Sequence, residues 1–133
     1  MIKNDIKTKN DIFLLVNCFY TKVKADPVLG PIFKSIIKDW EAHTQQLTIF
    51  WEASLFLKVK YTGNPIQTHI DVDKNTNNSI TQTHFGLWLN LWVQTVDQLY
   101  QGPYANNAKN KARKMSSYMF LKIFESRKDK HTK

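Results

Sequence analysis

The chain has 133 residues, of which 42% are hydrophobic and 13% are aromatic. This length and composition predict one folded domain with a hydrophobic core, and they argue against disorder. No apolar run approaches the roughly 18 residues of a membrane-spanning helix, so we expect no membrane contact. The polar start lacks the apolar core of a signal peptide, and the single cysteine excludes an intramolecular disulfide. These features predict a cytoplasmic protein.

The net charge of +8 suggests a nucleic-acid partner until its distribution is considered. Residues 109–133 contain nine Lys or Arg and two acidic residues, whereas the other 108 residues contain ten basic and nine acidic residues. The positive excess is therefore confined to the last predicted helix and its tail. We interpret this excess as a solvated basic face and expect no nucleic-acid partner.

Apolar residues at helical spacing predict a first helix that ends near residue 25, with Asn10 or Asp11 as its N-cap. Pro27 should end this helix, because it forces Asp26 out of helical backbone angles. The next segment, residues 27–37, contains two prolines and a glycine. It should therefore form no more than a turn or two of helix.

Asp39 should cap a long helix that runs to about residue 58. The inward face of this helix is predicted to contain Trp40, His43, Leu47, Phe50, Trp51 and Ser54. The segment YTGNP then interrupts the helix. Asn64 as a cap and Pro65 in the first helical position predict a short helix that carries His69.

Ser79 and Gln82 match a capping box for the next helix, which should run to Gly102 and Pro103. Its apolar face contains Phe85, Trp88, Trp92, Val96 and Leu99. The last helix should point Ala108, Ala112, Met115, Met119 and Ile123 inward. Residues 1–126 are predicted to form a single domain, and residues 127–133 a basic, disordered tail. Without any strand pattern, the sequence predicts an all-α fold.

Common catalytic motifs are absent from the sequence. It contains neither a Gly-rich phosphate loop, nor a G-x-S-x-G elbow, nor a C-x-x-C pair, and its histidines never have the spacing of a helical zinc site. Cys18 is interpreted as a small packed hydrophobe, and His84 as a surface residue. The remaining candidates are single polar side chains that lie among aromatic ones. A haem site needs one imidazole for the iron, apolar and aromatic side chains beside the macrocycle, and a few donors for a bound ligand. A plain helical domain without a cofactor is the alternative explanation of these residues.

The order of several motifs resembles the truncated haemoglobin family, group III. The motifs are F-Y, D-x-x-L-G-P-I-F, W-x-x-H, F-W, Y-x-G-x-P-x-x-x-H and F-x-x-W-L, and the resemblance covers about residues 11–124. The family's fold is a two-over-two helical sandwich around haem. The resemblance therefore implies an all-α, truncated globin-like fold and haem b (iron protoporphyrin IX) as the cofactor.

The resemblance also implies a role for each polar position. His69 matches the proximal ligand of the iron, and Tyr20 matches the distal tyrosine that donates to bound ligand. Trp88 matches a distal tryptophan whose indole N–H also reaches ligand, and His43 matches the distal histidine that often gates the pocket. The apolar pocket positions are Phe33, Leu47 and Phe50.

The implied function is a haem protein that binds O₂ and other small ligands (CO, NO, peroxide) at iron. Two distal donors in a dry pocket should retain O₂ firmly, which suits O₂, NO or peroxide chemistry better than bulk transport. Whether the protein is an enzyme stays open, with peroxidase-like and NO dioxygenase-like activity as the choices. An electron donor is a further expected partner, of unknown identity. The alternative is a helical nucleic-acid-binding or protein-interaction module without a cofactor.

Overall fold

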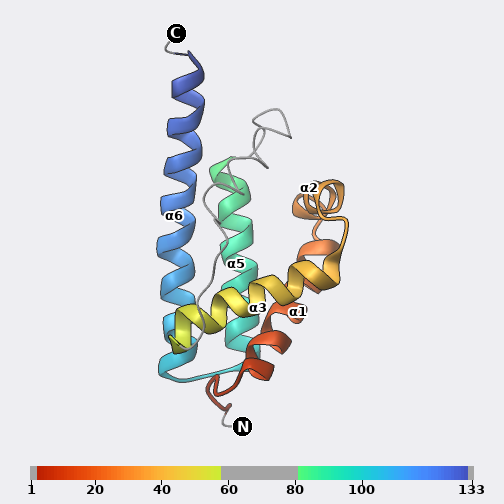
Figure 1. The fold of residues 1–133 in the computed structure, drawn as a ribbon, viewed down its shortest axis with the longest axis vertical. Coiled ribbons are helices and arrows are strands. Elements are labelled where there is room, and N and C mark those ends of the chain that lie inside the picture. Colours follow the sequence, from red (N-terminus) through yellow and green to blue (C-terminus); the bar gives the residue numbers. More distant parts are fainter. Residues whose placement is uncertain (1–2, 58–80, 132–133) are drawn as a thin grey trace.

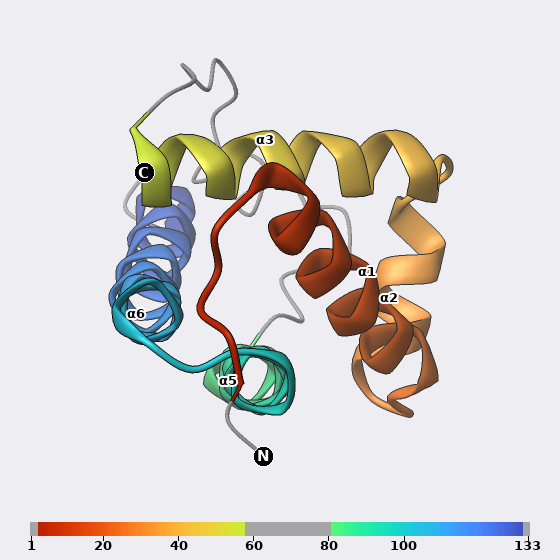
Figure 2. The same ribbon diagram turned by 90° about the horizontal axis from the view of Figure 1, so that it is seen from below.

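The computed structural model describes residues 3–57 and 81–131, and this part of the chain is helical without any strand. Its elements are α1 (Lys9–Ala25), α2 (Leu29–Ile36), α3 (Trp40–Phe56), α5 (Gln82–Leu99) and α6 (Pro103–His131). Helices α1 and α3 pack together as one pair and α5 and α6 as another, and the two pairs contact each other (Figures 1 and 2). Helix α2 lies beside α1 and also contacts α5. The predicted all-α, two-over-two arrangement is confirmed.

Local chemistry sets both ends of α1. The Thr8 hydroxyl accepts a hydrogen bond from the Asp11 N–H at 3.2 Å, and the Asp11 carboxylate accepts one from the Thr8 N–H at 3.1 Å. This capping box makes Thr8 the cap, so the predicted cap at Asn10 or Asp11 was placed too late in the chain. At the other end, Asp26 has extended backbone angles directly before Pro27, as predicted.

Helix α2 starts against the last turn of α1. The Asp26 carboxylate accepts hydrogen bonds from the backbone N–H groups of Val28 at 2.9 Å and Leu29 at 2.8 Å. At Gly30, a Cβ atom would lie 2.6 Å from the backbone oxygen of Lys24. The absence of a side chain at Gly30 therefore allows the two helices to approach this closely, which fixes α2 beside α1.

The buried face of α3 is shifted by about one position from the predicted face. Asp39 caps the helix as predicted, with its side chain accepting from a backbone N–H at 3.1 Å. The buried residues are Thr44, Thr48, Trp51 and Leu55. The other residues of the predicted face are only partly buried: Trp40, His43, Leu47, Phe50 and Ser54. The buried Thr48 hydroxyl is satisfied by donating to the Thr44 carbonyl at 2.8 Å.

Trp92 joins the two helix pairs. Its ring stacks on that of Trp51 from α3, with the centroids 4.6 Å apart, and its Nε1–H donates to the Ala108 carbonyl of α6 at 3.2 Å. The residues predicted to face inward from α6 are buried at Ala108, Ala112, Met119 and Ile123, and Met115 is partly buried. The inward face of α6 is therefore confirmed, with small residues where α6 meets α5.

The segment before α1 holds the turn between α5 and α6. The Asp5 carboxylate accepts from the backbone N–H groups of Tyr104 at 2.9 Å and Ala105 at 2.8 Å, which are unpaired donors of the first turn of α6. Gly102 has φ +145, and a Cβ there would lie 2.6 Å from the Asp5 carboxyl carbon. Asp5 thus acts as a cap for α6 from about a hundred residues earlier in the chain.

Two features differ from the prediction or lie beyond the described residues. Helix α6 continues to His131, so residues 127–131 are helical in this structure, whereas we predicted a disordered tail from residue 127. This helix contains no Gly, and no Pro after its first residue, and it is rich in helix-forming Lys and Arg. The predicted short helix that carries His69 falls in residues 58–80, outside the described residues.

We predict that Gly30→Ala lowers the free energy of unfolding by about 1–3 kcal/mol, because the new methyl group would overlap a backbone oxygen of α1. Urea denaturation followed by circular dichroism measures this change. Gly86→Ala is the matched control, since a Cβ at this position in α5 meets nothing within 4 Å. It should stabilise the protein by roughly 0.5–1 kcal/mol, and equal effects of the two substitutions would contradict the close contact at Gly30.

Candidate functional site

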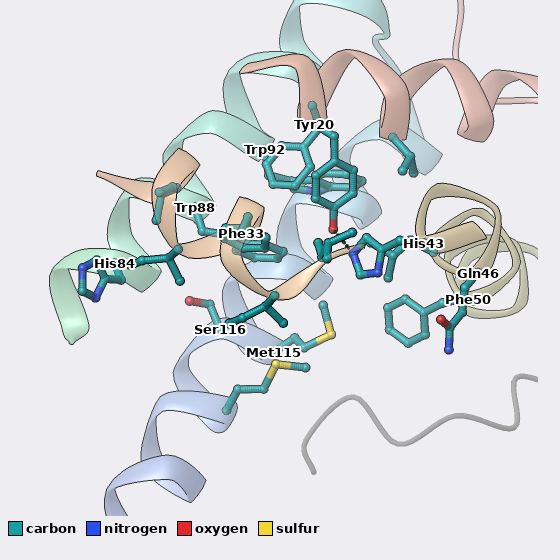
Figure 3. A pocket seen from close by; sticks show the side chains of 18 of the residues that line it. Tyr20, Phe33, His43, Gln46, Phe50, His84, Trp88, Trp92, Met115 and Ser116 are labelled. Carbon is teal, nitrogen blue, oxygen red and sulfur yellow. Dashed lines mark hydrogen bonds between the residues drawn. The ribbon is translucent and has the colours of Figure 1, made fainter. Parts of the chain in front are cut away.

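A cavity of about 450 Å³ lies among all five described helices (Figure 3). Its wall is mainly aliphatic and aromatic, and the largest group of lining residues comes from the inner faces of α1, α2 and α3. The lining residues of these three helices include Val16, Phe19, Tyr20, Leu29, Ile32, Phe33, Ala42, His43, Leu47, Phe50 and Trp51. Helices α5 and α6 complete the wall with Phe85, Trp88, Trp92, Met115, Ser116, Met119 and Ile123.

Two polar side chains meet at this wall. The Tyr20 hydroxyl lies 3.0 Å from His43 Nε2, and Figure 3 shows both groups facing the cavity. Helix α1 presents Tyr20 one position after the buried Phe19, and α3 presents His43 one position before the buried Thr44. Burial raises the pKa of the Tyr20 hydroxyl far above its ordinary value, so Tyr20 is a neutral phenol with one proton to donate.

Aromatic rings enclose Tyr20 on several sides. Its ring makes edge-to-face contacts with Phe19 at 5.1 Å, Trp40 at 5.6 Å and Phe33 at 6.3 Å between centroids. Such contacts restrict the ring to one orientation. The Tyr20 hydroxyl is therefore directed into the cavity by packing as well as by its hydrogen bond to His43.

The cavity brings together six of the seven site residues predicted from the sequence. Trp88 lies on the α5 side, where it meets Phe19 edge-on at 5.7 Å and lies parallel to Trp92 at 6.4 Å. The six that line the cavity are Tyr20, Phe33, His43, Leu47, Phe50 and Trp88. The seventh, His69, lies outside the described residues. Side chains from α1, α2, α3 and α5 therefore converge on one volume, although they are far apart in the sequence.

The sequence analysis missed the contribution of α6 to this site. Met115, Ser116 and Met119 line the cavity, and Met115 and Ser116 are labelled in Figure 3. We had assigned Met115 and Met119 to the core face. One feature of the sequence could have indicated this contribution. Met115 and Met119 lie four residues apart, and their flexible thioether side chains adapt well to the irregular wall of a cavity.

His84 has a structural role that the sequence analysis also missed. Thr81 is the N-cap of α5, and its backbone N–H donates to His84 Nδ1 at 2.8 Å. The predicted capping box from Ser79 to Gln82 is wrong, because the helix begins at Gln82 and the box joins Thr81 to His84. Accepting this bond leaves the proton of a neutral His84 on Nε2. His84 is half-buried and lines the cavity, so it is not merely a surface histidine.

Within residues 3–57 and 81–131, no group of three or more His, Cys, Asp or Glu side chains is arranged to hold a metal ion. Cys18 is a partly exposed free thiol on α1 and does not line the cavity. Among the described helices, none combines the length and apolar character that a membrane span requires.

Comparisons with known proteins match the chain over nearly its full length, in sequence and in structure. The sequence is 27% identical over 121 residues to a group 3 truncated hemoglobin, ctb, of Campylobacter jejuni, covering 88% of this chain and 91% of the relative. The fold matches a crystal structure of a group III truncated hemoglobin from Campylobacter jejuni with a TM-score of 0.81 and 26% identity, covering 92% and 95% of the two chains. No family model matches the sequence.

The raised pKa of Tyr20 predicts how stability depends on pH. Tyr20 stays protonated in the folded state, whereas in the unfolded state it ionises near pH ~10. Its contribution to the free energy of unfolding is therefore fully present below pH ~10 and falls by up to ~1.4 kcal/mol per pH unit above it. Tyr20→Phe should lose less stability than the wild type between about pH 8 and about pH 11.

Urea midpoints at these two pH values measure the effect. Identical pH dependence in the wild type and Tyr20→Phe would contradict the burial of a protonated Tyr20.

Proposed function

Because the chain belongs with the group III truncated haemoglobins in sequence and in fold, we propose that its cavity binds haem b and that the iron binds O₂ and other small ligands. The observation that carries this proposal is an apolar cavity of about 450 Å³ with two converging polar groups. Ligand pockets of ~300–1,000 Å³ have this character. The cavity lies beside a core in which Ile12, Leu15 and Val16 are fully buried.

The residues of the wall fit the chemistry of a flat macrocycle. Pockets of this size and apolar character bury most of the surface of a bound ligand, so the volume supports an occupant. The Phe33, Phe50, Phe85 and Met119 side chains offer apolar contacts of the kind that haem requires. Bound haem would supply an iron centre for diatomic or peroxide ligands, and Tyr20 and His43 would face those ligands.

We assign His69 as the proximal iron ligand, as the family resemblance implies. Two other histidines line the cavity and already make hydrogen bonds within the protein. His43 Nε2 contacts the Tyr20 hydroxyl, and His84 Nδ1 accepts from the backbone of Thr81. These contacts support a distal role for His43 and a capping role for His84. They support the proposal that His69, rather than either of these two, has the proximal role that the resemblance implies.

Tyr20 is the proposed donor to bound ligand, with the indole N–H of Trp88 as a second donor. The Tyr20 hydroxyl has a single proton, so a bound ligand competes with His43 for it when Nε2 is the acceptor. A ligand that takes this proton would weaken the link between Tyr20 and His43. This competition favours His43 as a gate that moves when ligand enters, rather than as a third donor or as an iron ligand.

Two donors in a buried pocket favour slow release of O₂, because hydrogen bonds are electrostatically stronger where water is excluded. Slow release suits a protein that converts O₂, NO or peroxide better than it suits a transport protein. Such conversions consume electrons, so a reductant is part of the proposal.

The alternative of a helical nucleic-acid-binding or interaction module has less support. Neither function requires an apolar cavity of this size. Two basic side chains of the C-terminal segment also hold helices together. Lys109 pairs with Asp97 at 2.7 Å, and Lys111 donates to the Ser54 carbonyl at 2.7 Å. The positive charge is therefore partly engaged in contacts within the fold.

We predict that His69→Ala loses most of its haem, or binds it with the spectrum of weakly ligated iron, because the iron loses its protein ligand. Absorption spectra and haem content per chain measure the change, and added imidazole should partly restore the wild-type spectrum. His84→Ala is the matched control and should retain haem. Unchanged haem content and spectrum in His69→Ala, with a loss in His84→Ala, would transfer the proximal role to His84.

Tyr20→Phe should speed O₂ dissociation by about fivefold or more, since it removes a hydrogen bond that contributes about 1 kcal/mol. Stopped-flow displacement of O₂ measures the rate. Trp88→Phe should act in the same direction, and the two effects should not add if both donors belong to one network.

His43→Ala is the contrasting variant. It should raise the rate of CO association several-fold and change O₂ release less than Tyr20→Phe does, because a gate affects entry more than retention. Equal O₂ release rates in the wild type and Tyr20→Phe would contradict the proposal that Tyr20 donates a hydrogen bond to bound ligand.

A further inference from the structure

Trp40 packs against Tyr20 and is the more exposed of the two rings. The two ring centroids are 5.6 Å apart. Tyr20 is 4% exposed and lines the cavity, whereas Trp40 is half-buried and does not line it. Two oxidisable rings in contact therefore form a path from the cavity wall to the surface, and this path does not require anything to enter the cavity.

The inner ring of this path has a partner that can take its proton. Loss of one electron makes a phenol strongly acidic, so a buried tyrosine is oxidised readily only if a base accepts its proton at the same time. His43 Nε2, 3.0 Å from the Tyr20 oxygen, is in position to do so when the imidazole proton is on Nδ1. The same proton can return to the phenol when Tyr20 is reduced again.

The outer ring has a charged neighbour. The Lys24 ammonium lies 4.3 Å from the centroid of the Trp40 ring. A cation over the ring stabilises the neutral indole and opposes positive charge on it. The same charge attracts an anion to this part of the surface. Lys24 therefore makes Trp40 harder to oxidise and favours a negatively charged electron donor.

We propose that Tyr20 and Trp40 relay single electrons from a small anionic phenol at the surface to the oxidised site in the cavity. The proposal rests on the proposed function, with hydrogen peroxide as the oxidant. Tyr20 gives up an electron to the site and its proton to His43. Trp40 then reduces the Tyr20 radical, and the proton returns. The phenol finally reduces Trp40 and releases its proton to water, and the site takes up one proton from water for each electron. Overall, one peroxide and two phenols give two waters and two phenoxyl radicals.

A second set of rings could also supply electrons to the oxidised site, but it does not connect the site to a donor at the surface. Trp88 lies parallel to Trp92 at 6.4 Å, and Trp92 stacks on Trp51 at 4.6 Å. Trp92 and Trp51 are 1% and 3% exposed, so a radical formed on them has no contact with an external donor. Trp88 is half-buried as well, but it lines the cavity, whereas the half-buried Trp40 does not. Among these rings of the described residues, Trp40 is therefore the one placed to meet a donor outside the cavity.

Electron paramagnetic resonance of the haem-loaded protein, frozen after addition of peroxide, tests the relay. The wild type should give a tryptophanyl radical, and a spin trap followed by peptide mass spectrometry should place it on Trp40. Trp40→Phe should lose this signal and accumulate a tyrosyl radical, whereas Tyr20→Phe should lose both. Tyr118→Phe is the control at an exposed tyrosine and should match the wild type.

Charged donors test the role of Lys24. Hydroxyphenylacetate is an anion and tyramine is a cation, although both are phenols. Trp40→Phe should leave the initial reaction with peroxide unchanged and slow re-reduction by hydroxyphenylacetate by about tenfold or more. Lys24→Met should raise the share of radical on Trp40 by at least about twofold and reduce the preference for the anion.

The outcomes separate the relay from the function on which it rests. A chain that takes up no haem would overturn the proposed function and the relay with it. Haem uptake and a reaction with peroxide, with the radical on Trp88, Trp92 or Trp51, would overturn the relay alone. Wild-type radical yields and donor rates in Trp40→Phe would also overturn it.

Discussion

The packing of α1 is the constraint on which the rest of the structure depends. This helix contacts α2, α3 and α5, and its buried residues form one continuous stripe along it. One side is closed by small residues, as where Gly30 of α2 meets the last turn of α1. One position after the buried Phe19, by contrast, Tyr20 faces the cavity. Close contact with these helices therefore fixes the orientation of the one hydroxyl that α1 contributes to the site.

Much of the fold could be predicted from the sequence because helix starts and stops are local. Pro27 and Asp39 act through their nearest neighbours, and both positions were identified. The start of α5 was misplaced for a physical reason. The capping-box pattern requires a side-chain acceptor three residues after the cap, and glutamate or glutamine usually provides it. Here the imidazole of His84 does so for Thr81, and sequence patterns for this motif do not include histidine.

The site was less predictable from the residues than from the family resemblance. Periodicity identifies the side of a helix that faces inward, but it does not separate contact with neighbouring atoms from contact with a cavity. Leu47 and Phe50 thus looked like core residues, although Thr48 and Trp51 occupy the buried face of α3. Met119 presented the same ambiguity on α6. Six residues indicated by the motif order line one cavity, and their roles toward a cofactor stay predictions. His69 also stays a prediction, because it lies outside the described residues.

The bond between Asp5 and the start of α6 has a consequence for how the chain is synthesised. A ribosome releases residue 5 long before residues 104 and 105, which supply the N–H groups that its carboxylate accepts. The segment before α1 therefore remains without this anchor while α1, α2, α3 and α5 emerge. Closing a loop of this length carries an entropic cost that a local cap does not have. The nascent chain should reach its final compactness only when α6 emerges, so the interval before then is when it depends most on chaperones.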